Sequence, residues 1–267
     1  MREIVYNSDK ILLDEGTFFG QGLFETILCL DKPLFLKEHL NRLQESMKYL
    51  ELETLEKKEL LEFLENINIK NKVLKILVTP KNIVITEREN PYTSDDYNRG
   101  MTLRISEVRR NSTSKMTKIK WNGYIENIIE KKEAIKNGYN DALFLNEKGF
   151  VTETSCANIF LIKNGVLLTP KIEDGLLGGI IREWIINNFN VIEKSITLDE
   201  LYHSDEVFIT NSLIGVMKVT GINDRVFEQG DLTNMISSKL GGLIHNGRQG
   251  KNKRRCKTYI GSYWRRS

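Results

Sequence analysis

The sequence predicts an α+β fold in two parts, with a smaller N-terminal α/β domain over residues 1–115 and a larger, strand-rich C-terminal domain over residues 116–246. Three observations support this prediction. Short apolar runs typical of strands are interspersed with segments whose apolar residues recur at helical spacing. Polar stretches over 89–100 and 109–118 predict loops or an interdomain connection. The 267 residues, 40% of them hydrophobic, are enough to bury a substantial core.

The N-terminal part begins with strand and hairpin signals and then becomes helical. Pro80-Lys81-Asn82 separates two apolar runs and predicts a hairpin. Leu40, Leu43 and Met47 recur at helical spacing and predict one buried helix face. The predicted strands cover residues 23–30, 33–36, 72–79, 83–88 and 102–108, and the predicted helices cover residues 37–50 and 56–68.

The C-terminal part has more strands and fewer helices. Its first helix, expected over about 123–137, has an apolar stripe that includes Ile125, Ile128, Ile129 and Ile135. A glycine cluster precedes the second helix. The predicted strands cover residues 141–146, 151–154, 158–163, 166–170, 207–210 and 216–219, and the remaining helices residues 179–189 and 231–245.

The composition excludes several classes of protein. No window approaches the roughly 18 apolar residues of a membrane span, and the charged, polar N-terminus is not typical of a secretory signal. We therefore expect a cytoplasmic protein with no membrane partner. Three dispersed cysteines and three histidines predict no metal site. Phosphate-loop, dinucleotide-binding, nucleophile-elbow and zinc-protease motifs are missing, so an enzyme of this sequence would need Lys, Glu, Tyr or a cofactor for proton chemistry.

The net charge of +3 comes from the C-terminal tail. Residues 247–267 contain eight Lys and Arg and no Asp or Glu, and without them 31 basic residues stand against 36 acidic ones. A basic run with Tyr and Trp could bind nucleic acid. The alternative is a disordered, solvated or non-native extension, which is the commoner case. We therefore expect the function to lie in residues 1–246.

Four segments form an ordered set. They are FGQGLFET (19–26), LFLKEHLNRL (34–43), KWNGYIEN (120–127), and VTETSCANIF (151–160) continuing through GLLGGIIR (175–182) to TNSLIGVMKV (210–219). In this order and spacing they resemble the class IV, D-alanine-aminotransferase-like and branched-chain-aminotransferase-like, family of pyridoxal-phosphate enzymes. The resemblance spans roughly residues 3 to 245 and implies the two-domain fold of type IV pyridoxal-phosphate enzymes.

The resemblance implies three residues that hold pyridoxal 5'-phosphate. Lys120 matches the lysine that forms the Schiff base, and a desolvated lysine is also a competent base. Glu153 matches the carboxylate that bonds the pyridine nitrogen, and Arg42 matches the phosphate-binding arginine. Without the resemblance, Glu153 would be interpreted as a solvent-facing strand residue and Arg42 as a solvated helix charge.

The same resemblance implies a second set of cofactor contacts. Backbone N–H groups at Ile180 and Ile181, where a helix opens, suit a phosphate. Family members often have Thr at position 181, so this chain lacks that hydroxyl but retains the backbone donor. Ser212 aligns with a hydroxyl that reaches the phosphate. Tyr124 is expected to bond the cofactor's phenolic oxygen or, alternatively, to be a core aromatic.

The family includes branched-chain and D-amino-acid aminotransferases and 4-amino-4-deoxychorismate lyase. The segment Arg109-Arg110-Asn111-Ser112, the run Thr210-Asn211-Ser212-Leu213 and the short length favour the lyase, which forms 4-aminobenzoate and pyruvate for folate synthesis. Lys218 replaces a proline common in the family, which weakens this assignment, so an aminotransferase remains the alternative. Candidate residues for the substrate carboxylates are Arg88, Arg110 and Asn211, each with a surface role as its alternative. The resemblance also implies a homodimer.

Overall fold

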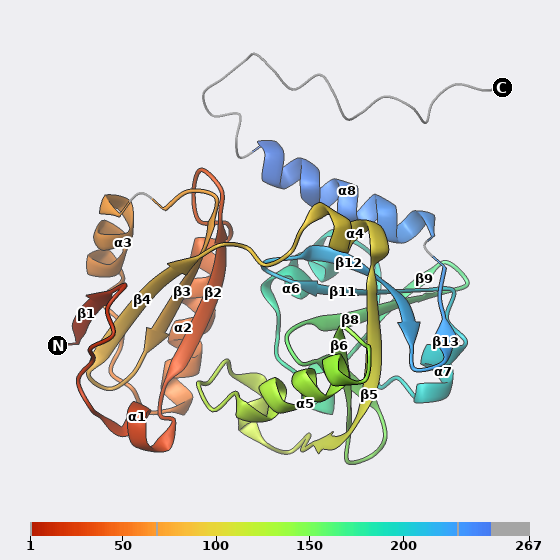
Figure 1. Ribbon diagram of the computed structural model, residues 1–267, viewed down its shortest axis with the longest axis horizontal. Coiled ribbons are helices and arrows are strands. Elements are labelled where there is room, and N and C mark those ends of the chain that lie inside the picture. The colour runs from red at the N-terminus through yellow and green to blue at the C-terminus, as the bar shows by residue number, and fades with distance from the viewer. Residues whose placement is uncertain (1, 68, 229, 247–267) are drawn as a thin grey trace.

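The computed structural model describes residues 2–67, 69–228 and 230–246, and its strands form two sheets, one in each half of the molecule (Figure 1). The first sheet has the order β1-β4-β3-β2, in which β2, β3 and β4 are antiparallel neighbours and β1 joins β4 in parallel. Its strands are β1 (Glu3–Tyr6), β2 (Leu23–Cys29), β3 (Lys72–Val78) and β4 (Asn82–Arg88).

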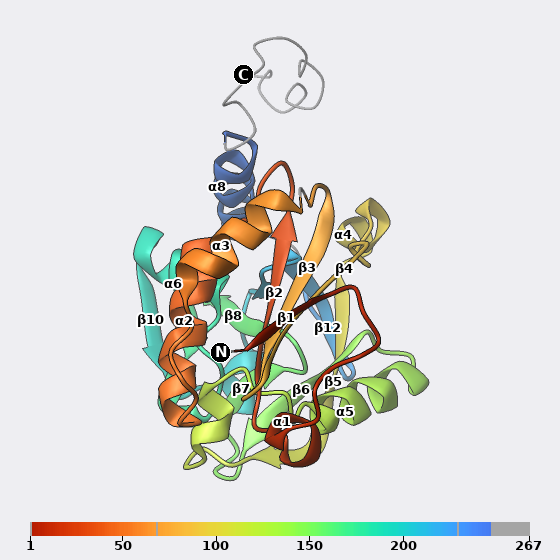
Figure 2. The same cartoon turned by 90° about the vertical axis from the view of Figure 1, so that its left-hand side faces the viewer.

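Helices α2 (Leu36–Tyr49) and α3 (Lys57–Asn66) lie on one side of this sheet (Figure 2). Leu40, Leu43 and Met47 are buried on α2, as their spacing predicts. The predicted return strand 33–36 does not form. Only Pro33 bridges to β2, because Phe35 adopts a left-handed conformation with φ 53° and α2 then begins. A short helix absent from the prediction, α1 (Glu15–Phe19), is capped by Asp14.

The second sheet has nine strands, and six of them close into a ring. Along the ring the order is β8-β11-β12-β5-β6-β7, and the pair Glu153–Asn158 joins β7 back to β8. Strands β9 and β10 extend from β8, and β13 pairs with β12. The strands are β5 (Met101–Arg110), β6 (Asp141–Asn146), β7 (Val151–Thr154), β8 (Asn158–Lys163), β9 (Val166–Pro170), β10 (Val191–Lys194), β11 (Glu206–Asn211), β12 (Gly215–Ile222) and β13 (Arg225–Val226).

Helices pack around the second sheet (Figure 1). Helix α5 packs on β5 and β6, α6 on β11, and α8 on β11 and β12. The helices are α4 (Ser94–Arg99), α5 (Ile125–Lys136), α6 (Ile180–Asn188), α7 (Leu198–Tyr202) and α8 (Asp231–Asn246), with 3₁₀ turns η1 (Lys115–Lys118) and η2 (Ile172–Asp174). Within the described ranges, no helix has the length and apolar character needed to cross a membrane.

The two sheets divide the chain earlier than the sequence indicates. Strand β5 pairs with β6 and β12, so the second sheet begins at Met101, and a division at residue 115 separates β5 from its own sheet. Part of the predicted loop 89–100 is helix α4. The mixture of helices and strands confirms the α+β class. The predicted basic tail, residues 247–267, lies outside the described residues.

Candidate active site

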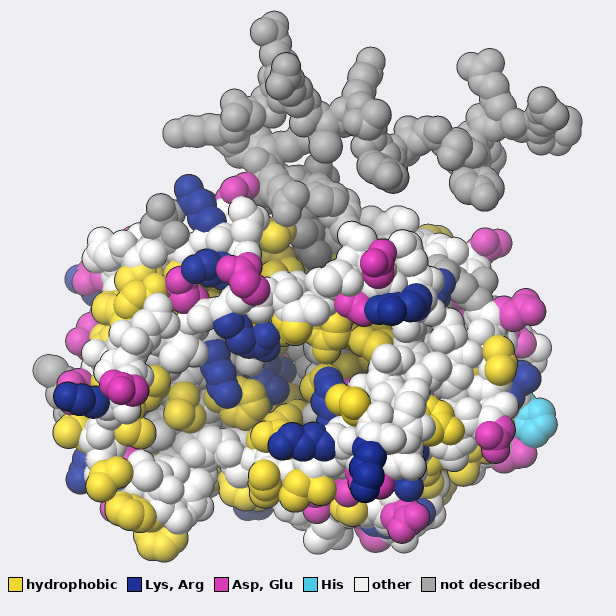
Figure 3. Space-filling view, viewed as in Figure 1, with side chains coloured by type: hydrophobic (Ala, Val, Ile, Leu, Met, Phe, Trp, Pro, Cys, Tyr) yellow, Lys and Arg dark blue, Asp and Glu magenta, His cyan; other side chains and the backbone are white. Residues whose placement is uncertain are grey.

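A cavity of about 590 Å³ is lined by residues from both halves of the molecule. On this face, Figure 3 shows a hollow between the halves with Lys and Arg side chains gathered around it. Its volume lies in the range typical of small-molecule sites. The predicted residues that line it are Arg42, Arg88, Lys120, Tyr124, Glu153, Ile180, Asn211 and Ser212. Arg110 and Ile181 are not among the lining residues.

Lys120 is held in place by main-chain pairing with β2 and the glycine before it. The Phe24 N–H donates to the Lys120 carbonyl at 2.9 Å, and the Asn122 N–H donates to the Gly22 carbonyl at 2.9 Å. A Cβ atom on Gly22 would lie 3.1 Å from the Asn122 side chain and 3.2 Å from the Val78 carbonyl oxygen. The glycine-rich entry to β2 therefore allows the lysine segment to approach closely.

The environment of the Lys120 amine is apolar on one side and cationic on another. Its Nζ lies 4.3 Å from the ring centre of Phe24 and 5.2 Å from that of Tyr124. Burial and the nearby Arg42 charge lower the pKa of Lys120 to about 8, although Glu25 and Glu153 oppose the shift. About one tenth of this amine is therefore uncharged at pH 7, far more than for an ordinary lysine, and able to act as nucleophile or base.

Glu153 occupies the pair that closes the strand ring. Its Oε2 accepts hydrogen bonds from the Leu177 N–H at 3.2 Å and from Asn158 Nδ2 at 3.4 Å. Burial raises the pKa of Glu153 to about 7, opposed chiefly by the Arg110 charge. A cationic ligand group beside this carboxyl would favour its ionised form.

Arg110 lies outside the cavity lining, but its charge acts on Glu153. Its guanidinium carbon stacks 3.8 Å from the Phe144 ring centre, and its Nη1 donates to Glu126 at 2.8 Å. The Glu126 carboxylate and the Phe144 ring hold this side chain outside the cavity lining. From there its positive charge acts to lower the pKa of Glu153.

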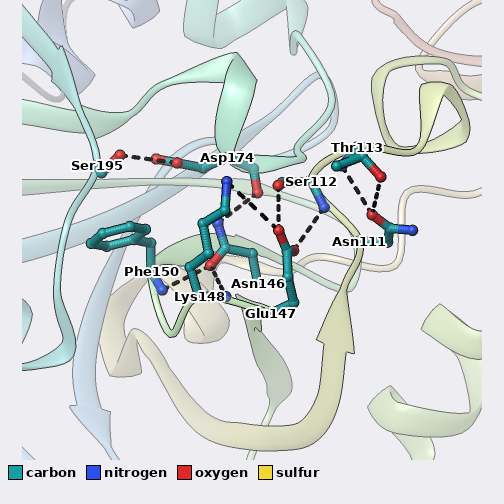
Figure 4. A network of polar contacts seen from close by, with 9 residues as sticks. All are labelled: Asn111, Ser112, Thr113, Asn146, Glu147, Lys148, Phe150, Asp174 and Ser195. Carbon is teal, nitrogen blue, oxygen red and sulfur yellow. Dashed lines mark hydrogen bonds and ion pairs between the residues drawn. The ribbon is translucent and has the colours of Figure 1, made fainter.

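The neighbouring Asn111 and Ser112 belong to a structural network (Figure 4). The Ser112 N–H and Oγ both donate to Glu147, at 2.9 and 2.6 Å, and Asn146 Nδ2 donates to the Asp174 carbonyl at 3.1 Å. Asn111 Oδ1 accepts from Thr113. These bonds fix the loop before Lys120 onto the β6–β7 turn. Asn111 and Ser112, two residues of the segment 109–112 that favoured the lyase in the sequence, therefore have structural roles in this loop.

One part of the cavity lining is suited to an anion. Arg42 lines it, and its Nη1 donates to the Gly178 carbonyl at 2.9 Å. Ile180 and Ile181 are the first residues of α6, whose N-terminal N–H groups lack partners within the helix. The Ile181 side chain is buried in the core, so only its backbone can serve an anion. A Cβ on Gly179 would overlap Asn158 Oδ1, which explains the glycine there.

Two predicted residues have their polar groups engaged within the protein. The Tyr124 hydroxyl donates to the Ser155 carbonyl at 2.7 Å, so a cofactor oxygen would have to compete for its proton. The Asn211 Oδ1 accepts from the N–H groups of Leu213 and Ile214, and its Nδ2 donates to the Cys156 carbonyl. Asn211 therefore closes the turn that carries Ser212.

Sequence reasoning missed several polar residues of this site. Lys75 and Lys131 line the cavity, and so does Thr210, whose buried hydroxyl has no partner among the described residues. Glu25 is buried and bonds Arg42. Lys75 lies between apolar residues of β3, and Glu25 lies between Phe24 and Thr26 of β2. A strand pattern does not reveal which polar side chain borders a cavity.

These residues fit pyridoxal 5'-phosphate. Lys120 supplies a buried amine with a lowered pKa, Glu153 a carboxyl for the ring nitrogen, and Arg42 with the α6 N-terminus donors for the phosphate. The orphaned Thr210 hydroxyl in the lining is a further polar group that a ligand could satisfy.

Comparison with known proteins agrees with this fit. The amino-transferase class IV family matches residues 22–222. The chain is 31% identical over 259 residues to a putative branched-chain-amino-acid aminotransferase of Methanocaldococcus jannaschii, covering 86% of this chain and 89% of that protein. It is 26% identical over 239 residues to the aminodeoxychorismate lyase of Bacillus subtilis, covering 79% and 80%. A solved putative 4-amino-4-deoxychorismate lyase of Legionella pneumophila is 28% identical, with a TM-score of 0.79 and coverage of 90% and 98%. The chain belongs to the class IV aminotransferase family of pyridoxal-phosphate-dependent enzymes.

Proposed function

We propose that this protein is an aminodeoxychorismate lyase that converts 4-amino-4-deoxychorismate into 4-aminobenzoate and pyruvate. The observation that carries the proposal is the charge of the cavity. Arg42 and Lys120 serve the cofactor, and three further cations line the cavity, namely Lys75, Arg88 and Lys131, against Glu153 as the acidic lining residue.

This charge suits a substrate with two carboxylates. Aminodeoxychorismate carries one carboxylate on its ring and one on its enolpyruvyl group. A branched-chain amino acid carries one carboxylate and an aliphatic side chain, which three exposed or half-buried cations would not favour. Lys75 and Arg88 come from the first sheet, whereas Lys131 comes from α5, so the cations reach the cavity from both halves. Cations on separate elements could each bind one of the two carboxylates.

In the proposed reaction, Lys120 moves the proton. When bound, the cofactor supplies an electron sink for the carbon that bears the substrate amine. The uncharged Lys120 Nζ takes the proton from this carbon, the adjacent C–O bond breaks, and the ring becomes aromatic. Lys120 then returns the proton to the methylene carbon of the departing enolpyruvate, which gives pyruvate. The lowered pKa of Lys120 suits both the removal and the return of a proton near neutral pH.

An aminotransferase is the second candidate, and a specific finding favours it. The relative from Methanocaldococcus jannaschii, with the higher identity of the two, is a putative branched-chain-amino-acid aminotransferase. An aminotransferase that uses glutamate as donor would also bind two carboxylates. Since both reactions begin with the same proton removal, the cofactor residues do not separate them.

The deciding experiment supplies aminodeoxychorismate without any keto acid. We expect equal amounts of 4-aminobenzoate and pyruvate over many turnovers. No pyruvate, together with amino transfer from valine or D-alanine to 2-oxoglutarate, would refute the lyase. Lys131→Met should raise the KM for aminodeoxychorismate about tenfold through a lost charged contact, whereas Lys58→Met, whose side chain is 88% exposed on α3, serves as the control.

We also propose that the protein is a homodimer. Helix α5 turns its apolar stripe outward, with Ile125 64% exposed, Ile129 54% and Ile135 55%. The side chains that α5 buries are instead Asn127 and Ala134. Several exposed isoleucines on one side of a helix are typical of a surface that a second chain covers.

A further inference from the structure

A buried charged network surrounds Arg42, which lines the cavity. Glu25, on β2, is 1% exposed and accepts two bonds from Arg42, from Nε at 2.8 Å and from Nη2 at 2.6 Å. His39 Nδ1 lies 2.6 Å from the same carboxylate. The Arg42 charge and the His39 and Arg42 hydrogen bonds outweigh the burial of Glu25 and lower its pKa to about 2. Glu25 is therefore ionised over the whole working pH range.

Arg42 is fixed at a second point, in the other half of the molecule. Its Nη1 donates to the Gly178 carbonyl at 2.9 Å, one residue before the N-cap of α6. A guanidinium has five N–H bonds, and these contacts use three of them. The two that remain, one on each terminal nitrogen, belong to a side chain that lines the cavity.

Fixing both ends of a guanidinium determines where its free N–H groups point. An arginine side chain loses conformational entropy when it is held, and a side chain that is already held does not lose this entropy again when its ligand binds. The bidentate contact with Glu25 sets the plane of the group, and the contact with Gly178 sets its rotation relative to α6.

We propose that Glu25, supported by His39, is a positioning residue for cofactor phosphate recognition, because it holds Arg42 so that its two free N–H groups converge with the N-terminus of α6 on the phosphate. The inference rests on the proposed role of Arg42 toward the phosphate and is independent of whether the enzyme is a lyase or an aminotransferase. Glu25 itself touches Arg42 and His39, and its effect on the phosphate acts through Arg42.

The test compares two ligands that differ only in the phosphate. Wild type and Glu25→Gln are each loaded either with pyridoxal 5'-phosphate or with pyridoxal. The loaded proteins are diluted, and the dissociation constant of each ligand is measured from the absorbance of its bound form. The variant should bind pyridoxal 5'-phosphate about tenfold more weakly, the usual size of a charged hydrogen bond, and pyridoxal within about twofold of wild type. In Arg42→Met, adding Glu25→Gln should cause no further loss.

The controls separate positioning from general damage. Glu87→Gln removes another sheet carboxylate, which pairs with Lys72 at 2.7 Å away from the cavity lining, and should change neither constant. If Glu25→Gln does not fold, His39→Gln provides the same comparison with a smaller expected loss for the phosphate ligand. Equal weakening of both ligands, or no weakening of either, would overturn the proposal. Failure of the lyase assay would leave these constants unaffected.

Discussion

The lowered pKa of Lys120 predicts when this amine reacts. With an ordinary pKa of 10.5, about one lysine in 3000 is uncharged at pH 7, whereas with a pKa of about 8 the fraction is about one in ten, a gain of about 300-fold. The shift has two named causes, the burial of the amine and the positive charge of Arg42, so it depends on the folded pocket.

Cofactor-free protein and pyridoxal provide the assay. Pyridoxal has no phosphate, so the rate at which the bound absorbance appears follows the Lys120 amine rather than the anion site. Between pH 6 and pH 10.5 the rate should rise with a midpoint near pH 8. Lys120→Ala should give no signal, and Lys58→Ala, on α3, should behave as wild type. A midpoint at or above pH 10 would refute the lowered pKa of Lys120 in this pocket.

The same shift predicts a change in stability. A lysine whose folded pKa is below its unfolded value binds its proton more weakly when folded. Folding with the charged lysine therefore lowers the free energy of unfolding, and this cost is fully present below pH 8. It disappears as the pH rises from about 8 to 10.5. Converted at 1.36 kcal/mol for each pKa unit, the cost is at most about 3 kcal/mol. Lys120→Met should therefore raise the free energy of unfolding of cofactor-free protein at pH 7, and equal or lower stability in urea titrations would contradict this.

Three further predictions concern other parts of the site. Because the pKa of Glu153 is raised to about 7, cofactor affinity should fall as the pH drops below 7, and the fall should be smaller in Glu153→Gln, where the Lys120 amine still titrates; a pH-independent wild type would count against the role of this carboxyl. Gly179→Ala should displace Asn158 and weaken cofactor binding about tenfold, measured by dilution of loaded protein; unchanged binding would show that the N-terminus of α6 tolerates a Cβ. Ile129→Glu should convert a dimer to a monomer in light scattering, whereas Ile192→Glu, on the exposed β10, should not; a wild-type monomer would contradict the assembly.

Much of the fold follows from local patterns. The apolar runs became β2, β3, β4, β6, β8 and β9, and the helical spacing of Leu40, Leu43 and Met47 became the buried face of α2. Short elements were missed because caps and neighbours stabilise them more than periodicity does. Helix α7 illustrates this, since Thr197 and Glu200 form a capping box whose spacing was present in the sequence. The apolar stripe of α5 was also misleading, since it is exposed.

The site was harder to predict than the fold. Lys120, Glu153 and Arg42 were predicted as cofactor residues through a family resemblance, because no local pattern distinguishes one lysine or glutamate from the others. Glu25 was overlooked because its partners lie 14 and 17 residues further along the chain. Arg110 was assigned to the substrate by residue type, yet it stacks on Phe144 and acts on Glu153. Such pairings depend on how strands and helices meet, and spacing along the sequence does not encode them.

Lys120 is positioned by its main chain, whereas its chemistry depends on its side-chain amine. Its position is set by main-chain bonds to β2, and its side chain makes no hydrogen bond or ion pair with the residues that the structure describes. Replacing the side chain should therefore remove the amine and leave the pocket intact. Replacing Gly22 would push Asn122 away and move the lysine segment without touching the amine. Arg42 is held by Glu25 of β2 and by Gly178 in the other half of the molecule. The groups proposed for the aldehyde and the phosphate of the cofactor are therefore both positioned from neighbouring residues of β2, Lys120 through Phe24 and Arg42 through Glu25.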